Sequence, residues 1–170
     1  MYVIATLCIF CALVLQEPAY ALNNVTVGGE RAMIIGGEDA QPGQFPYQMF
    51  LRVTKDSGDN LCGGTLLTEK YILTAAHCLK DVINPSDITV TAAEYDFFTP
   101  EGNEQDRTVI KMTSHELYNG DSKLGYDIAV LQVSPAFDLN NLVTTAKLST
   151  SDPDPGVSCT ILGWGTTHEV

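Results

Sequence analysis

The chain has 170 residues, enough for one ordinary domain or for one large part of a longer protein. Apolar residues make up 45% of it and charged residues 18%, a balance typical of folded proteins that excludes a wholly disordered chain. The net charge is −12 and the basic residues form no cluster, which excludes sequence-general binding to nucleic acid.

The first element is an apolar run from Val3 to Leu15, followed by the small-residue pattern Ala19-Tyr20-Ala21. A run of about 13 apolar residues before such a pattern predicts a secretory signal peptide over residues 1–21, and hence an extracellular protein. The positively charged start typical of signal peptides is missing, and the alternative is a buried core helix. The run is too short for the roughly 18 residues of a membrane span, so no membrane partner is expected.

Residues 22–33 are short and polar, and they are predicted to be a propeptide that carries a glycosylation sequon at Asn24. Removal of the signal peptide leaves three cysteines, Cys62, Cys78 and Cys159. A secreted chain is expected to pair its thiols, so the odd count predicts that one partner lies elsewhere.

Short apolar runs separated by turn residues fill the stretch from Ile34 to about Val133. Six such runs at regular spacing predict an all-β fold, either a closed barrel or a sandwich, over residues 34–135. The predicted strands are Tyr47–Val53, Thr65–Leu67, Tyr71–Thr74, Ile88–Ala92, Thr108–Met112 and Ile128–Val133.

The chain then becomes rich in proline, aspartate and asparagine, which predicts a connection between two domains at residues 136–156. The apolar run Val157–Leu162 predicts one more strand, and Gly163-Trp164-Gly165 follows it.

His77 follows the predicted strand Tyr71–Thr74, within the sequence Thr74-Ala75-Ala76-His77-Cys78. A histidine in such a place is more often structural than catalytic. A disulfide between Cys62 and Cys78, 16 residues apart, would close a short loop and fix the backbone beside His77. A fixed backbone favours a general base, because catalysis loses rate steeply when the base is misplaced.

Asp127 stands directly before the apolar run Ile128-Ala129-Val130-Leu131. The simplest interpretation is a polar residue that ends a loop. The functional alternative is a carboxylate that accepts a hydrogen bond from an imidazole and fixes its tautomer.

Five motifs occur in the order seen in serine endopeptidases of the chymotrypsin and trypsin type, which this chain resembles from Ile34 to about Thr167. The resemblance implies that His77 is the general base and that Asp127 orients it. It also implies a Cys62–Cys78 disulfide, a partner for Cys159 in a second barrel, and two six-stranded antiparallel barrels with the active site between them. The motifs are Ile34-Ile35-Gly36-Gly37, Cys62-Gly63-Gly64-Thr65-Leu66, Thr74-Ala75-Ala76-His77-Cys78, Asp127-Ile128-Ala129-Val130-Leu131 and Gly163-Trp164-Gly165.

Two features depart from this family. The family's nucleophile lies in a Gly-Asp-Ser-Gly-Gly stretch beyond Gly-Trp-Gly, and the serines of this chain at positions 114, 122, 149 and 158 lack that context. The chain is therefore expected to be the N-terminal portion of a precursor, inactive without the missing second barrel. Ile34, the implied new N-terminus, follows Met33 instead of the usual Arg or Lys.

The segment from Glu94 to Glu104 holds four carboxylates in 11 residues, a density that suits Ca²⁺. The simpler interpretation is a solvated acidic turn. The segment also resembles the calcium loop of trypsin-like proteins. That resemblance implies carboxylate ligands from Glu94, Glu101 and Glu104, with backbone carbonyl ligands from Asp96 and Thr99.

The sequence thus predicts a secreted serine endopeptidase that cleaves peptide bonds in proteins and needs no cofactor for catalysis, with a structural calcium as one interpretation of its acidic loop. One alternative is a non-catalytic, shortened relative that acts as a secreted binding protein. Another is an extracellular calcium-binding module.

Overall fold

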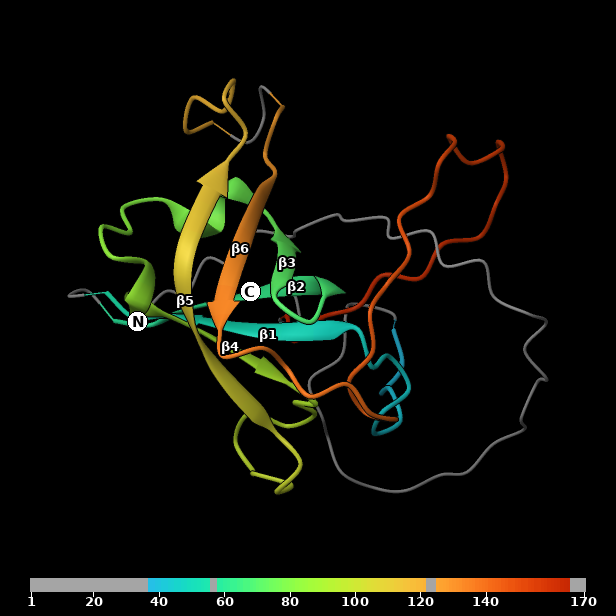
Figure 1. Cartoon of the computed structure of the whole chain (residues 1–170). Helices are drawn as coiled ribbons and strands as arrows, with labels where there is room; N and C mark the ends of the chain where they lie inside the picture. Colours follow the sequence, from blue (N-terminus) through green and yellow to red (C-terminus); the bar gives the residue numbers. More distant parts are fainter. Residues whose placement is uncertain (1–36, 56–57, 122–124, 166–170) are drawn as a thin grey trace. The chain divides into compact units, whose positions relative to one another are not determined.

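The computed structural model describes residues 37–55, 58–121 and 125–165. Six antiparallel strands close into a barrel in the order β1-β2-β3-β6-β5-β4, which confirms the predicted all-β, six-stranded barrel (Figure 1). The strands are β1 (Gln48–Val53), β2 (Asn60–Thr68), β3 (Tyr71–Thr74), β4 (Ile88–Ala92), β5 (Gln105–Ser114) and β6 (Ala129–Ser134). Two short 3-10 helices, η1 (Ala76–Leu79) and η2 (Pro85–Asp87), connect β3 to β4.

Several predictions fall outside the described residues. They are the signal peptide, the propeptide with its sequon at Asn24, and the new N-terminus at Ile34. Within the part of the chain that is described, no helix combines the length and apolar character needed to cross a membrane.

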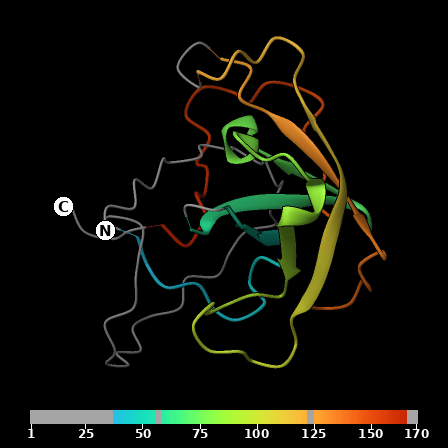
Figure 2. The same ribbon diagram turned by 90° about the vertical axis from the view of Figure 1, so that its left-hand side faces the viewer.

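Closure of the barrel brings distant parts of the chain together. β3 pairs with β6, and Thr74 lies opposite Ala129 at the end of that ladder. β5 also pairs with β6, and Figure 2 shows these two strands side by side along one wall. The residues after Thr74 and those before Ala129 therefore leave the barrel next to each other.

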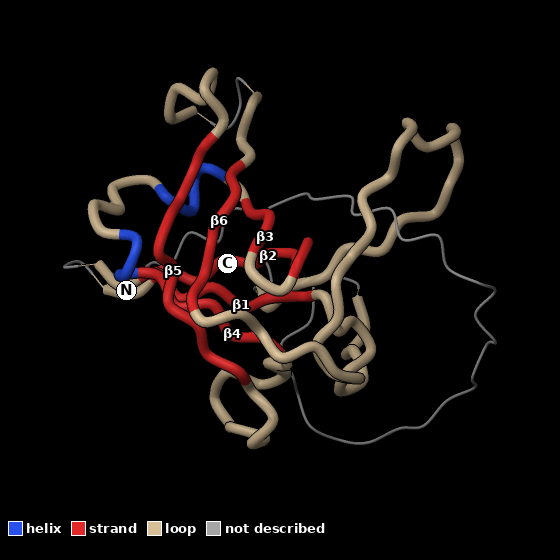
Figure 3. Tube along the Cα trace, in the orientation of Figure 1, coloured by secondary structure: helices blue, strands red, loops and turns tan. Residues whose placement is uncertain are grey.

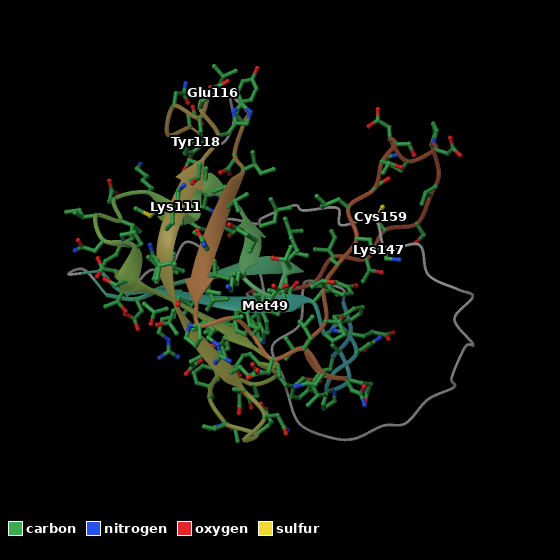
Figure 4. All side chains as sticks on the ribbon, viewed as in Figure 1. Met49, Lys111, Glu116, Tyr118, Lys147 and Cys159 are labelled. Atoms are coloured by element: carbon green, nitrogen blue, oxygen red, sulfur yellow. A yellow bond between two sulfur atoms is a disulfide. The ribbon has the colours of Figure 1, made fainter. Side chains whose placement is uncertain are left out.

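The barrel core follows from the alternation of side chains along the strands. In β1, Met49, Leu51 and Val53 are fully buried (Met49 is labelled in Figure 4). On the opposite face Arg52 is exposed, whereas Phe50 is buried and stacks on Phe97. Alternate residues of a strand point to opposite faces, so Met49, Leu51 and Val53 fill the barrel. Further fully or almost fully buried residues are Leu66, Ile72, Ile88, Val90, Val109, Leu131 and Val133.

β2 begins before the predicted strand Thr65–Leu67 and includes Gly64, where the neighbouring strands leave no room for a side chain. A Cβ atom at position 64 would lie 2.7 Å from Ile72 Cγ2 and 2.9 Å from Leu51 Cδ1. Only a residue without a side chain lets β2 pass this closely between its neighbours. Gly63 and Gly64 belong to β2, but they interrupt the alternation of apolar and polar residues by which a strand is predicted.

The segment after β6 packs on the barrel further than predicted. Phe137 and Val143 are buried, and the Phe137 N–H donates to the Glu69 carbonyl at 2.8 Å. The Ala146 N–H likewise donates to the Leu66 carbonyl at 2.8 Å. Residues 41–146 form one compact unit.

The structure does not form the predicted strand Val157–Leu162. These residues are outside any strand, and Figure 3 draws the described residues from 147 onward as loop. Val157 and Ile161 are 48% and 47% exposed. A strand needs a neighbour to pair its backbone N–H and C=O groups, and within the described ranges none pairs with this segment.

Candidate active site

His77 is held between a strand and a disulfide. It follows β3 as the second residue of η1, and the two alanines before it, Ala75 and Ala76, are buried. Cys78 and Cys62 form a disulfide with their Cα atoms 6.3 Å apart, which ties η1 to β2. The backbone around His77 is thus anchored from both directions.

Asp127 meets His77 across 50 residues of sequence. The backbone N–H of His77 donates to Asp127 Oδ1 at 2.7 Å, and Nδ1 of the same residue lies 2.7 Å from Oδ2. An ionised carboxylate can only accept hydrogen bonds, so Nδ1 must be the donor. Both side chains are about one-fifth exposed, at 21% and 19%. The carboxylate therefore fixes both the position and the tautomer of the imidazole.

The chemistry of this pair follows from the tautomer. With its proton on Nδ1, a neutral imidazole keeps the lone pair on Nε2, where it can accept a proton. Nε2 lies 3.7 Å from Cys78 Sγ, a bridged sulfur that carries no proton. For the same reason, the group of Cys62, His77 and Cys78 is unsuited to a metal ion, because the disulfide uses both thiolates.

The acidic loop between β4 and β5 brings three carboxylates together. One oxygen from each of Glu94, Glu101 and Glu104 lies within 4.8 Å of the other two. The loop is shaped by its own backbone, because the Gly102 N–H donates to Glu104 Oε2 at 2.7 Å and the Asp96 N–H donates to Glu101 Oε1 at 3.2 Å. The other two predicted ligands form the turn beside the carboxylates, where the Thr99 N–H donates to the Asp96 carbonyl at 2.7 Å.

Electrostatics in the acidic loop favour a cation. Burial raises the pKa of Glu94, and the charges of Glu101, Glu104 and Asp106 raise it further. Backbone hydrogen bonds lower the pKa of Glu104 and keep it ionised. Glu94 Oε1 is buried and has no hydrogen-bond partner within the described structure. A buried carboxylate oxygen facing two further carboxylates fits an oxygen-seeking ion such as Ca²⁺.

Comparison with known proteins identifies the family. A family profile described as Trypsin matches residues 34–170. The chain belongs to the trypsin family. It is 42% identical over 113 residues to coagulation factor IX of Oryctolagus cuniculus, covering 65% of this chain and 38% of that protein. It is 37% identical over 134 residues to Trypsin-3 of Homo sapiens, covering 79% and 41%.

A third relative is matched over more of its length. Trypsin-1 of Astacus astacus is 37% identical over 139 residues, which cover 80% of this chain and 58% of the relative. The chain thus spans between 38% and 58% of the length of these three relatives.

The structure of this trypsin-family chain adds contacts that the sequence analysis missed. The backbone N–H of His77 donates to Asp127, where only a contact with the imidazole was expected. Thr74 Oγ1 donates to the Gly63 carbonyl at 2.8 Å and joins two of the sequence motifs. The strand pairing of Thr74 with Ala129 could have indicated that His77 and Asp127 leave the barrel side by side. Cys159, the third cysteine, is exposed.

Proposed function

We propose that this chain is the N-terminal part of a secreted serine endopeptidase precursor that cleaves peptide bonds in proteins. His77 accepts the proton of the nucleophile through Nε2 and returns it to the leaving amine. Asp127 holds the proton on Nδ1 and stabilises the imidazolium that forms. The observation that carries the proposal is the pair of 2.7 Å contacts from one carboxylate to both N–H groups of one histidine.

The nucleophile and the oxyanion hole belong to a second barrel, as in the family the chain resembles. An imidazole and a carboxylate alone form no acyl-enzyme, because no hydroxyl is activated. The 170-residue chain by itself is therefore expected to have no peptidase activity. Labelling of this chain by a fluorophosphonate probe, or a burst of product from an active ester, would contradict this expectation.

A chimera tests the chemistry directly. Residues 34–170, which start at the N-terminus expected after activation, would be joined to the part of Trypsin-1 of Astacus astacus that follows the matched segment. Peptidase activity is expected, and it should be lost by several powers of ten in His77→Ala, since removal of any member of a catalytic triad leaves only about 10³–10⁴-fold catalysis over water. An active chimera whose activity survives His77→Ala would exclude His77 as the base.

The gene supplies an independent test. If the transcript continues in frame beyond the codon of Val170 to a Gly-Asp-Ser-Gly-Gly stretch, the precursor proposal stands. A stop codon there would favour the secreted binding protein instead. Secretion itself is supported by the apolar run Val3–Leu15 before Ala19-Tyr20-Ala21. N-terminal sequencing of secreted material should start after Ala21 in the precursor and at Ile34 once it is activated.

We propose in addition that the acidic loop binds a structural Ca²⁺. Glu94, Glu101 and Glu104 would supply carboxylate oxygens, and the Asp96 and Thr99 carbonyls would complete the shell. The buried Glu94 Oε1 supports this assignment, since a carboxylate oxygen without a donor is costly to bury unless a cation faces it. The ion would hold the loop and take no part in peptide cleavage.

A further inference from the structure

The backbone directly before Asp127 has an unusual conformation. Tyr126 has a φ of +59°, in the left-handed region that residues with a side chain rarely adopt. The Ile128 N–H donates to the Tyr126 carbonyl at 2.8 Å and closes a three-residue turn with Asp127 at its centre. Such a conformation persists only where the surrounding structure holds it.

His115, the residue directly after β5, contacts this turn. Its backbone N–H donates to the Ile128 carbonyl at 2.9 Å. Its ring stacks on the ring of Tyr126, with the centroids 4.9 Å apart and the planes at 21°. Its Nδ1 accepts the Leu117 N–H at 3.2 Å, which fixes the orientation of the ring. The left-handed Tyr126 therefore packs against the His115 ring, whose orientation is fixed by the Leu117 N–H.

The barrel alone does not reach the carboxylate. The ladder between β5 and β6 ends at the pair Ser114 and Ala129, two residues after Asp127. Beyond it the chain continues through Glu116 and Tyr118, both labelled near the top of Figure 4; Glu116 is exposed, whereas Tyr118 is partly buried against the core. His115 therefore contacts the residues on both sides of Asp127, Tyr126 through its ring and Ile128 through its backbone.

We propose that His115 and Tyr126 are positioning residues that aim the Asp127 carboxylate at His77. We call this pair the ring clasp. It acts through the turn at Asp127, and it keeps both carboxylate oxygens directed at the two N–H groups of His77. The inference rests on the proposed function, in which the tautomer of His77 matters. A purely structural stack would stabilise the loop without affecting that tautomer.

The test reads the tautomer in the full 170-residue chain. The ¹⁵N shifts of the His77 ring, measured at a pH of about 8 where an ordinary imidazole is neutral, give the ratio of Nδ1–H to Nε2–H forms. Tyr126→Asn tolerates the left-handed backbone but removes the ring. The ratio is expected to fall on the order of threefold to tenfold, as the charge-assisted hydrogen bond is partly lost. Tyr126→Phe keeps the ring and should retain the wild-type ratio.

His115 gives a second, independent variant. His115→Ser removes the ring but keeps the backbone N–H, so it tests the clasp even if Tyr126→Asn does not fold. His115→Phe restores an aromatic ring and should restore the ratio. The unfolding midpoint of each variant is measured alongside. A wild-type ratio in folded Tyr126→Asn or in folded His115→Ser overturns the proposal, whatever happens to stability.

One further variant separates this proposal from the one it rests on. Asp127→Asn should lower the ratio on the order of tenfold or more, because the charged acceptor is lost. If Asp127→Asn leaves the ratio unchanged, the proposed role of Asp127 fails and the clasp fails with it. If Asp127→Asn lowers the ratio while the ring variants do not, the clasp alone is wrong.

Discussion

The two ends of strand β5 carry the two candidate sites, and the sites are built in different ways. After β5 ends, Asp127 meets His77 from 50 residues away, through a contact that exists only when the barrel has closed. Before β5 begins, the hydrogen bonds within the acidic loop join residues two to five positions apart. Figure 1 shows the two loops at opposite ends of the same strand. One site therefore depends on tertiary structure and the other on local turns.

The largest expected effect lies at the His77 end. The double change Cys62→Ala and Cys78→Ala removes a disulfide that closes a loop of 16 residues. The free energy of unfolding should fall by about 3 kcal/mol, since the unfolded chain gains freedom. Guanidinium unfolding measures it, and added reductant should lower the stability of the wild type but not of the variant. An unchanged midpoint would mean that strand pairing alone holds η1 against β2.

Loss of the carboxylate should come next. Asp127→Ala leaves two donors of His77 without their charged acceptor and should cost about 1.5–3 kcal/mol of stability. A matched change at the other end of β5 is Asp106→Ala, which removes the single 2.6 Å hydrogen bond from Thr91 Oγ1 to Asp106. This change removes one hydrogen bond to a carboxylate instead of two and should cost about 1.5 kcal/mol, the lower end of that range. Equal losses in urea unfolding would contradict the view that the His77 end depends more on tertiary contacts.

Calcium should act at the acidic end alone. An ion that binds only the folded chain raises the free energy of unfolding by about 1–3 kcal/mol at 10–100 times its dissociation constant. The triple change of Glu94, Glu101 and Glu104 to Gln should abolish that gain, whereas Asp127→Ala should keep it. Thermal unfolding with calcium, and with magnesium for comparison, measures it. A calcium gain that disappears in Asp127→Ala would show that the two ends are coupled.

The sequence predicted the barrel better than the geometry of either site. All six strands were anticipated, because apolar alternation reports burial residue by residue. β2 and β5 are longer than predicted, since Gly63, Gly64 and the charged residues of β5 interrupt that alternation. The predicted strand Val157–Leu162 shows the limit of the method: its residues favour a strand, but a strand also needs a pairing partner.

The site residues were found by motif, and their contacts were not. Local sequence names His77 and Asp127 but says nothing of the hydrogen bond between the His77 N–H and Asp127 Oδ1, which depends on the pairing of β3 with β6. It also gives no sign that Tyr126 is left-handed, because no glycine or asparagine marks that position. Conformations imposed by tertiary contacts leave no local signal.

A smaller effect is expected for Glu94→Gln, whose change in melting temperature should have opposite signs with and without calcium. Its pKa is raised above the usual 4.5, so the folded chain binds the proton more readily than the unfolded chain. The free energy of unfolding therefore falls as pH rises from 4.5 towards the raised pKa. With a chelator at pH about 7, Glu94→Gln should raise the melting temperature. With calcium it should lower it. The same sign in both conditions would exclude Glu94 as a ligand.

The smallest effect is expected at Tyr118, beside the His77 end. Burial raises the pKa of its phenol, and the charges of Asp127 and Asp121 raise it further. Its hydroxyl is buried with no hydrogen-bond partner in the described structure, while the ring packs against the core. Tyr118→Phe keeps the ring and loses only the hydroxyl, so stability at neutral pH should change by no more than about 0.5 kcal/mol.

At alkaline pH, the effect of Tyr118→Phe on the free energy of unfolding should also report the charge of Asp127. A phenol whose pKa is raised in the folded chain makes the free energy of unfolding fall as pH rises above 10.0, its usual value. Tyr118→Phe should flatten that decline, and Asp127→Asn should flatten it partly by removing one of the raising charges. The ultraviolet absorbance of tyrosinate, compared between wild type and each variant, isolates this residue from the other tyrosines. A loss of more than about 1 kcal/mol at neutral pH would instead show that the hydroxyl binds a group that supports the site, because deleting an unpartnered hydroxyl removes no hydrogen bond.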